Sequence, residues 1–414
     1  MVSNPIKAKG GAHMKKWISA AVLLLCILVA VSAGVTVLIW QNEPPSEPAA
    51  QQEIRASSGS APAHSEETPS EPAGPQVVID GQPMQTVSAL RGDTVMVSAE
   101  EFTDRMQADY AYSPDSGTLT LTWNDRTAEL TVGADMAVLN GETVSVEAPY
   151  VIDDTVMIPA AVIAEAFAAD ATVDRDTLFL TPYAGEWEVP SGYAVPTLMY
   201  HAVSDDTWGT AELFVRPSEM ERQLQYLTEH GYTTITFEDL YRIDEIEKPV
   251  LLTFDDGYDD NYEILFPLLK KYNCKATIFI ITRSYEKGGD PSATHKMTKK
   301  QMKELSDSGL VSIQSHTRTH RRLGELSADE QEAELRRSRL QLLRCTGKLP
   351  FVLCYPEGSY NRDTLALAPD FYRFGLKMTG GLYRTSDNPL LVNRYYISRN
   401  TTLSTFASYV SHSD

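Results

Sequence analysis

The chain has 414 residues, 43% of them hydrophobic, and a formal net charge of −20 at pH 7. This length allows two or three domains, and the hydrophobic content is enough for each of them to have a core. The negative charge argues against nucleic acid and other polyanions as partners, whereas a neutral or cationic polymer is compatible with it.

The first forty residues have the pattern of a membrane anchor. An apolar run without charges covers 17–40, long enough to cross a bilayer as a helix, and four lysines precede it: Lys7, Lys9, Lys15 and Lys16. By the positive-inside rule, residues 1–16 then lie in the cytoplasm. We therefore expect a single-pass protein of a bacterial cell membrane, with its remaining residues outside the cell. A signal peptide cleaved near Ala33 is the alternative, but the apolar run is longer than is usual for one.

The segment 41–76 has the composition of a spacer. It consists mainly of Pro, Ser, Glu, Ala and Gln and has almost no large apolar side chain. Such a segment cannot bury a core, and its acidic charges repel one another, so we expect it to be disordered and extended.

An internal repeat follows the spacer. The sequence DTVMVSA at 93–99 returns as DTVMIPA at 154–160, and each copy continues into a helix-like stretch and an alternating strand. Two copies of one strand–helix–strand unit predict a small α+β domain over 77–184. The second copy resembles the stalk domain known as copper amine oxidase N-terminal-like. The sequence has no His, Cys or Met cluster there to bind copper, so we interpret the domain as a spacer or a wall-binding module.

From residue 189 to residue 414, short apolar runs alternate with helical patterns. Helices are predicted after a capping box of Ser218 with Glu221, ending at Gly231, and over 328–345. Strands are predicted to begin near Pro196, Thr233, Val250, Ala276, Val311, Phe351, Phe374 and Arg394. This alternation predicts a parallel α/β sheet or barrel whose active site lies at the carboxyl ends of the strands.

Two of these strands end in residues that can bind a metal. The run 250–252 leads into Asp255 and Asp256, and the run 311–314 leads into His316 and His320. One carboxylate and two imidazoles suit a borderline divalent metal such as zinc, and a second carboxylate is left to act as a base.

Three segments resemble, in order and spacing, the first three motifs of the polysaccharide deacetylase (NodB-homology) family: TFDDG at 253–257, HTRTH at 316–320 and YPEG at 355–358. The resemblance implies a distorted (β/α) barrel over 189–414 and a metal-dependent hydrolase that removes acetyl groups from the amide nitrogen of N-acetylglucosamine units. It implies that Asp255 is the general base and that the metal, zinc or alternatively cobalt, nickel or manganese, is held by Asp256, His316 and His320. The substrate and oxyanion loop would be Tyr355, Pro356, Glu357 and Gly358.

The chain departs from the usual family pattern in three places. The segment 391–394 lacks the histidine of the common Leu-x-His motif, and His201 after the first barrel strand resembles the proton donor of the branch that acts on poly-N-acetylglucosamine. Cys354 stands where an arginine is usual, so Arg394 is predicted to pair with Asp255 instead. Glu357 stands where Tyr or Phe is usual, which affects substrate fit.

These observations favour a membrane-anchored deacetylase of a cell-surface glycan, either a poly-N-acetylglucosamine-like polymer or peptidoglycan. An esterase acting on O-acetylated polysaccharide is the nearest alternative. A catalytically weak glycan-binding protein is the alternative from another class, and metal content would separate it from an enzyme.

For the cysteines of the C-terminal domain, buried free thiols are favoured over a Cys345–Cys354 disulfide.

Overall fold

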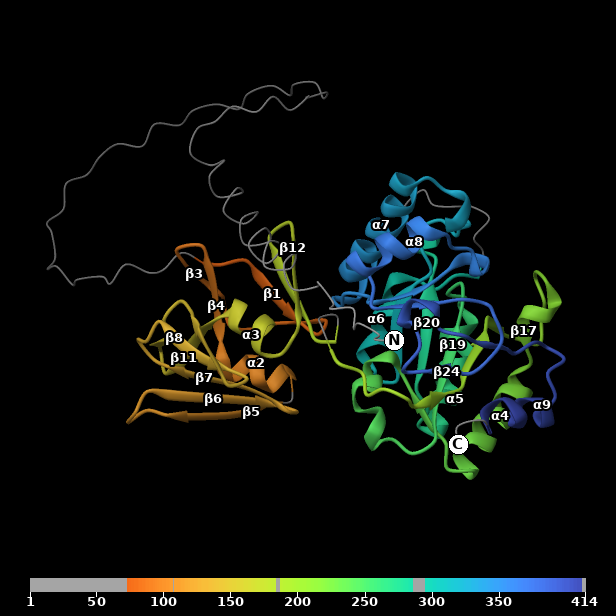
Figure 1. The fold of residues 1–414 in the computed structure, drawn as a ribbon, viewed down its shortest axis with the longest axis horizontal. Coiled ribbons are helices and arrows are strands. Elements are labelled where there is room, and N and C mark those ends of the chain that lie inside the picture. Colours follow the sequence, from red (N-terminus) through yellow and green to blue (C-terminus); the bar gives the residue numbers. More distant parts are fainter. Residues whose placement is uncertain (1–72, 107, 184–186, 286–294, 412–414) are drawn as a thin grey trace, which may run out of the picture.

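The computed structural model describes residues 73–106, 108–183, 187–285 and 295–411. They form two lobes, an N-terminal lobe up to residue 183 and a larger C-terminal lobe from residue 187 (Figure 1). Over these ranges no helix has the length and apolar character needed to cross a membrane. The predicted anchor at 17–40 and nearly all of the predicted spacer lie outside the described residues.

The N-terminal lobe is built on the predicted repeat. Strand β4 (Thr94–Ser98) leads into helix α2 (Ala99–Met106), and β11 (Thr155–Pro159) leads into α3 (Ala160–Ala166). The two equivalent strands pair with each other antiparallel, with Val97 opposite Ile158. In the core, the ring of Phe102 in α2 stacks on that of Phe167, which directly follows α3, with centroids 5.7 Å apart. The repeat therefore forms one core from two copies of one unit.

The N-terminal lobe contains three sheets, one of which includes the paired strands β4 and β11. Their strand orders are β12-β13-β1-β2, β10-β11-β4-β3 and β5-β6-β7-β8-β9. The remaining strands are β1 (Gln76–Ile79), β2 (Gln82–Pro83), β3 (Ala89–Arg91), β5 (Asp109–Ser113), β6 (Thr118–Trp123), β7 (Arg126–Thr131), β8 (Met136–Leu139), β9 (Glu142–Ser145), β10 (Tyr150–Ile152), β12 (Asp170–Asp174) and β13 (Thr177–Thr181).

The C-terminal lobe contains an eight-stranded sheet in which every pair is parallel. Its order is β23-β22-β21-β20-β19-β15-β25, with β18 beside β19. Each predicted strand start lies within one residue of the observed one: β15 (Thr197–Tyr200), β18 (Thr233–Ile235), β19 (Pro249–Phe254), β20 (Ala276–Ile280), β21 (Val311–Ser315), β22 (Val352–Cys354), β23 (Phe374–Leu376) and β25 (Tyr395–Tyr396). The predicted α/β class is confirmed.

The segment around β25 closes this sheet into a distorted barrel. Val392 forms a parallel bridge with Leu376 of β23, and a few residues later Tyr395 and Tyr396 pair with β15 at the other edge. Strand β19 is buried along its whole length, as expected for a parallel strand covered on both faces. Short pairs outside the barrel are β14 (Ala194–Val195) with β24 (Tyr383–Arg384) and β16 (Ala202–Val203) with β17 (Phe214–Val215).

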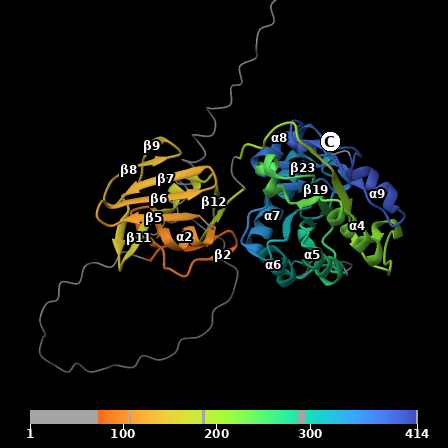
Figure 2. The ribbon, with the colours of Figure 1, turned by 90° about the horizontal axis from the view of Figure 1, so that it is seen from below.

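Helices surround the barrel, as Figure 2 shows for α4 to α7 around β19. They are α4 (Pro217–Glu229), α5 (Phe266–Tyr272), α6 (Lys299–Asp307), α7 (Ala328–Thr346), α8 (Arg362–Leu367) and α9 (Leu403–Val410). The predicted capping box at Ser218 is wrong. Helix α4 begins at Pro217 without a side-chain cap, because proline already suits the first helical position. Glu221 instead forms an ion pair with Lys271, 2.5 Å away.

The two lobes contact each other at the end of α7. Arg344 forms two hydrogen bonds with Asp174, at 2.6 and 2.7 Å, and Lys348 pairs with Asp80 at 3.0 Å. Between these pairs, a Cβ atom on Gly347 would lie 2.6 Å from the Cα of Gly81. The backbones therefore meet at a distance that only glycine allows.

Candidate active site

The parallel arrangement gathers the predicted site residues at one end of the barrel. Asp255 and Asp256 follow β19, His316 follows β21, and His201 follows β15. Because strands β15, β19, β20 and β21 are parallel neighbours, their carboxyl ends meet at one edge. Arg394, just before β25, reaches this edge from the segment that closes the barrel.

Three side chains at this edge, those of Asp256, His316 and His320, form a group that can hold a metal ion. Donor atoms of Asp256, His316 and His320 all lie within 4.8 Å of one another. The Oδ1 atom of Asp256 is 3.5 Å from the Nε2 atom of His316 and 3.6 Å from that of His320. That oxygen is buried and accepts no hydrogen bond from the described residues. A buried carboxylate oxygen facing two imidazole nitrogens fits a cation at their centre, and the donor set suits zinc.

The hydrogen bond of His316 fixes which of its nitrogens can bind a metal. Its Nδ1 atom lies 2.8 Å from the carbonyl oxygen of Cys354. A carbonyl only accepts, so Nδ1 carries the proton and the lone pair of Nε2 faces Asp256. Burial lowers the pKa of His316 to about 4, although Asp255 acts in the opposite direction. The ring is therefore neutral at pH 7, which is the form that binds metals.

Asp255 is held by an arginine, as the sequence predicted. The Nη1 and Nη2 atoms of Arg394 lie 2.7 and 2.9 Å from the two carboxylate oxygens of Asp255. Burial alone would raise the pKa of Asp255, but the guanidinium outweighs it and holds that pKa well below its ordinary value. Asp255 is therefore ionised and able to accept a proton.

Cys354 occupies the space beside this pair. Its Sγ atom lies 3.1 Å from Nη2 of Arg394 and 3.5 Å from Oδ2 of Asp255. Burial raises the pKa of this thiol well above its ordinary value, so it is a neutral neighbour of the ion pair. Cys345 and Cys354 are both free, with Cys354 buried and Cys345 partly buried; the predicted absence of a disulfide between them agrees with this, and the prediction of a buried thiol holds for Cys354.

His201 lies at the same edge of the barrel. Its Nδ1 atom is buried and has no hydrogen-bond partner among the described residues. Burial lowers the pKa of His201, while the carboxylates of Asp255 and Asp256 act to raise it. Burial therefore favours the neutral imidazole in the free protein, and the role of His201 as a proton donor stays a prediction.

The third motif forms a short loop whose side chains point to different environments. Tyr355 is fully buried and donates its hydroxyl to the carbonyl of Leu390 at 2.9 Å, and Pro356 is also buried. These two residues hold the loop and cannot touch a substrate with their side chains. Glu357 is exposed and lies 3.4 Å from Arg322, so it is the side chain of the loop that can meet a substrate.

Each of the three motifs contains a residue other than glycine with a left-handed φ angle, as do eleven other described residues outside the motifs. Asp256, Thr317, His320 and Glu357 all have left-handed φ angles, of 74°, 62°, 60° and 53°. Residues other than glycine adopt this conformation at a cost of about 1–3 kcal/mol each, and such residues cluster at functional sites. The candidate ligands Asp256 and His320 are therefore positioned by a backbone conformation that the surrounding fold holds in place.

Two residues beside Asp256 were missed from the sequence. Lys296 donates from Nζ to the carbonyl of Asp256 at 3.0 Å and lies 3.5 Å from the centre of the Tyr258 ring. Burial and the carboxylate of Asp256 raise the pKa of Tyr258. Because Tyr258 directly follows the TFDDG motif at 253–257, the sequence could have suggested that its side chain lies at this site. No sequence signal connects Lys296, forty residues away, to this centre.

Comparison with known families agrees with this geometry. The family model "Polysaccharide deacetylase" matches residues 242–372, and the model "Copper amine oxidase N-terminal domain" matches residues 76–181. Both resemblances predicted from the sequence are confirmed. His201 and Arg394 lie outside the matched range of the deacetylase model, whereas Cys354 and Glu357 lie inside it.

Individual relatives extend the comparison. YxkH of Bacillus subtilis, named as a polysaccharide deacetylase, is 33% identical over 222 residues, which are 52% of this chain and 76% of that protein. The poly-beta-1,6-N-acetyl-D-glucosamine N-deacetylase of Staphylococcus aureus is 30% identical over 197 residues, 45% of this chain and 66% of that protein. The solved structure of the Streptococcus pyogenes deacetylase PplD in complex with acetate is 32% identical, covering 53% of this chain and 99% of its own, with a TM-score of 0.49. With the three motifs joined in one centre and a relative matched over three quarters of its length, the chain belongs to the polysaccharide deacetylase family.

Proposed function

We propose that the chain is a metal-dependent N-deacetylase of a poly-β-1,6-N-acetylglucosamine-like polysaccharide. The observation that carries this proposal is the pairing of two units at one edge of the barrel. One is the candidate metal group of Asp256, His316 and His320, and the other is the ionised carboxylate of Asp255 held by Arg394. A glycan-binding protein without activity would need neither unit.

Different residues of the chain have different roles in the proposed amide hydrolysis. A divalent ion such as zinc, when bound, polarises the acetyl carbonyl and lowers the pKa of water. Asp255 takes the proton of the attacking water, and Arg394 keeps it ionised for that purpose. A backbone amide in the loop 355–358 supports the charge that develops on the carbonyl oxygen.

The leaving amine needs a proton, and His201 is the candidate to give it. In the free protein its imidazole is neutral, so it must gain a proton during turnover before it can act as an acid. Its place after the first barrel strand supports the poly-N-acetylglucosamine branch, and the staphylococcal relative is named for that substrate. Peptidoglycan is the runner-up, and an O-acetylated polysaccharide is the alternative that needs no acid of this kind.

Acetate release from three defined substrates tests this proposal. The full chain is incubated with β-1,6-linked N-acetylglucosamine oligomers, with peptidoglycan and with O-acetylated xylan. We expect the first to be deacetylated most efficiently. Preferential hydrolysis of xylan esters would replace the proposal with the esterase alternative, and no acetate from any of the three would favour a binding protein.

We also propose that residues 17–40 anchor the chain in a bacterial cell membrane with both lobes outside. The support is the lysine asymmetry and the apolar run of the sequence. Protease added to intact protoplasts is expected to release a soluble deacetylase by cutting within 41–76. Both lobes staying protected until the cells are lysed would reverse this topology.

A further inference from the structure

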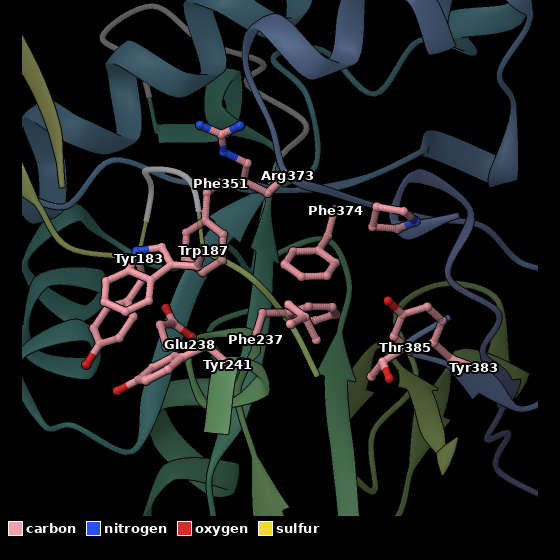
Figure 3. Close-up of a pocket in the computed structure, with 12 residues that line it drawn as sticks. Tyr183, Trp187, Phe237, Glu238, Tyr241, Phe351, Arg373, Phe374, Tyr383 and Thr385 are labelled. Atoms are coloured by element: carbon pink, nitrogen blue, oxygen red, sulfur yellow. The ribbon is translucent and has the colours of Figure 1, made fainter. Parts of the chain in front are cut away.

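An aromatic hollow lies at the junction of the two lobes, and Figure 3 shows the side chains that line it. They come from the end of the N-terminal lobe, the connecting segment and the barrel. Phe351 and Phe374 in its wall lie at the amino ends of β22 and β23, whereas the candidate catalytic residues follow the carboxyl ends of their strands. The hollow is therefore at the opposite end of the barrel, and the residues that support the candidate site lie elsewhere, beside the segments that follow β15 and β19.

The ring of His201 is not fixed by a hydrogen bond at its Nδ1 atom. That atom is buried and has no partner among the described residues. The ring of Tyr396 stands edge-on to the imidazole, with centroids 6.4 Å apart. The position of the imidazole therefore depends on packing and on the backbone that carries it, so the groups that hold this backbone decide where the ring lies.

Two side chains of the segment after β19 hold the backbone around His201. The Nδ2 atom of Asn261 donates to the carbonyl oxygen of His201 at 3.1 Å. The Oδ1 atom of Asp260 accepts from the backbone N–H of Val203 at 2.8 Å. The same Oδ1 atom accepts from Nδ2 of Asn261 at 2.7 Å. The two side chains are thus one connected unit that binds the chain at His201 and again two residues later.

This unit is buried, and its orientation is fixed. Asn261 is fully buried and Asp260 nearly so. Both N–H donors of the Asn261 amide are used, one on His201 and one on Asp260. Turning the amide over would point its oxygen at the carbonyl of His201, and two acceptors cannot pair. Asn261 also begins a π-helical turn, η3 (Asn261–Leu265), and such turns are rare and frequent at functional sites.

We propose that Asn261 and Asp260 are positioning residues that hold His201 where it can protonate the leaving amine. Their hydrogen bonds go to the backbone beside the imidazole, so they act through His201. The same segment carries Asp255, whose backbone N–H donates to the carbonyl of Tyr200 at 2.9 Å. One segment thus fixes the proposed base and the proposed acid relative to each other. The proposal rests on the role of His201 in the proposed function.

A cycle of variants with His201→Ala tests this on the full chain. Asn261→Ala is made in the parent and in His201→Ala, and acetate release from a β-1,6-linked N-acetylglucosamine oligomer is compared with turnover of 4-nitrophenyl acetate. The amine of the oligomer needs an acid to leave, whereas nitrophenolate does not. Asn140→Ala is the matched control, because Nδ2 of Asn140 also donates to a backbone carbonyl, that of Ala166 at 2.8 Å, in the N-terminal lobe.

We expect Asn261→Ala to lower kcat for the oligomer by about tenfold to 100-fold in the parent, as for a small displacement of a catalytic group. KM, metal content and turnover of 4-nitrophenyl acetate should change far less. In the His201→Ala background the same change should have little further effect on the oligomer, because the side chain that Asn261 positions is absent. Asp260→Ala should behave like Asn261→Ala, whereas Asp260→Asn keeps an acceptor oxygen for Val203 and should retain most of the turnover.

Equal losses from Asn261→Ala in the two backgrounds, or parental turnover of the oligomer in that variant, would overturn the positioning role. Should Asn261→Ala fail to fold, Asp260→Ala takes its place in the cycle. The His201→Ala protein separates this failure from a failure of the proposed function. If His201→Ala has lost turnover of the oligomer and Asn261→Ala has not, only the positioning role is wrong; if His201→Ala keeps parental turnover, the assigned acid is wrong as well.

Discussion

Arg394 and Asp255 form a bidentate ion pair in the interior of the barrel, with Nη1–Oδ1 and Nη2–Oδ2 distances of 2.7 and 2.9 Å. The side chain of Arg394 is fully buried, and that of Asp255 nearly so. Arg394 lies in the segment that closes the barrel between β23 and β15. The contact that completes the fold is therefore also the contact that orients the proposed general base.

Replacing Arg394 by Met should be costly, because it leaves a buried carboxylate without its partner. We expect a loss of about 3–5 kcal/mol in the free energy of unfolding. Adding Asp255→Asn removes the unpaired charge, so the double variant should recover part of that loss. Thermal unfolding of the parent, the two single variants and the double variant measures this cycle. A double variant less stable than Arg394→Met alone would contradict it.

The role of His201 can be separated from metal binding by the leaving group of the substrate. An amine must be protonated to leave, whereas a nitrophenolate leaves without a proton. We expect His201→Ala to lower turnover of an N-acetylated glucosamine oligomer by about 100-fold or more, and to lower turnover of 4-nitrophenyl acetate far less. Metal content, measured alongside, should not change. Equal losses on the two substrates would show that His201 is not the acid.

Sequence patterns predicted the barrel and most of its centre for a physical reason. Parallel strands bring residues at their carboxyl ends together, so a strand ending in Asp255-Asp256 and another ending in His316 must meet if the sheet is parallel. The pairing of Arg394 with Asp255 could also be predicted from the sequence. Cys354 stands where the family usually has an arginine, and a buried carboxylate needs a positively charged partner. The structure contains that pair, while the catalytic roles stay predictions.

Other features depend on contacts that no local pattern encodes. Lys296 donates to the carbonyl of Asp256 although forty residues of sequence separate the two. The neutral state of His201 follows from its burial, which the sequence does not give. The aromatic hollow requires the two lobes to be docked, and its wall comes from three separate segments. The start of α4 was predicted incorrectly because two adjacent residues favour the start of a helix. Proline suits the first helical position and serine suits the N-cap, and the structure uses Pro217.

The docking of the lobes can be tested at Gly347. An alanine there would place its Cβ 2.6 Å from the Gly81 Cα, in addition to its left-handed φ of 79°. Gly309 has a similar φ of 72° with nothing within 4 Å of its added Cβ, which makes Gly309→Ala a control for backbone strain alone. That strain should cost about 1–2 kcal/mol in both variants. Gly347→Ala should lower the thermal unfolding midpoint further and expose the lobe junction to protease; equal midpoints would contradict the close approach.

A pH-dependent contribution to stability should come from Asp260, behind the catalytic edge. Burial raises its pKa to about 6, against hydrogen bonds from Val203 and Asn261 that act to lower it. A carboxyl whose pKa is raised by folding stabilises the folded state while protonated, and this contribution is lost as the pH rises through about 6. Relative to Asp260→Asn, the parent should lose about 2 kcal/mol between pH 4 and pH 7.5. Unfolding of both proteins at the two pH values measures it, and a constant difference would refute it.

The central claim is that acetate release depends on a divalent metal held by Asp256, His316 and His320. The most direct measurement is acetate released from a β-1,6-linked N-acetylglucosamine oligomer before chelation, after it, and after zinc is added back. We expect the parent and the control His230→Ala, which lies on the exposed end of α4, to lose activity on chelation and regain it with zinc. His320→Ala should bind no stoichiometric metal and stay inactive throughout. Acetate release that persists in the chelated parent, or in His320→Ala, would contradict the account.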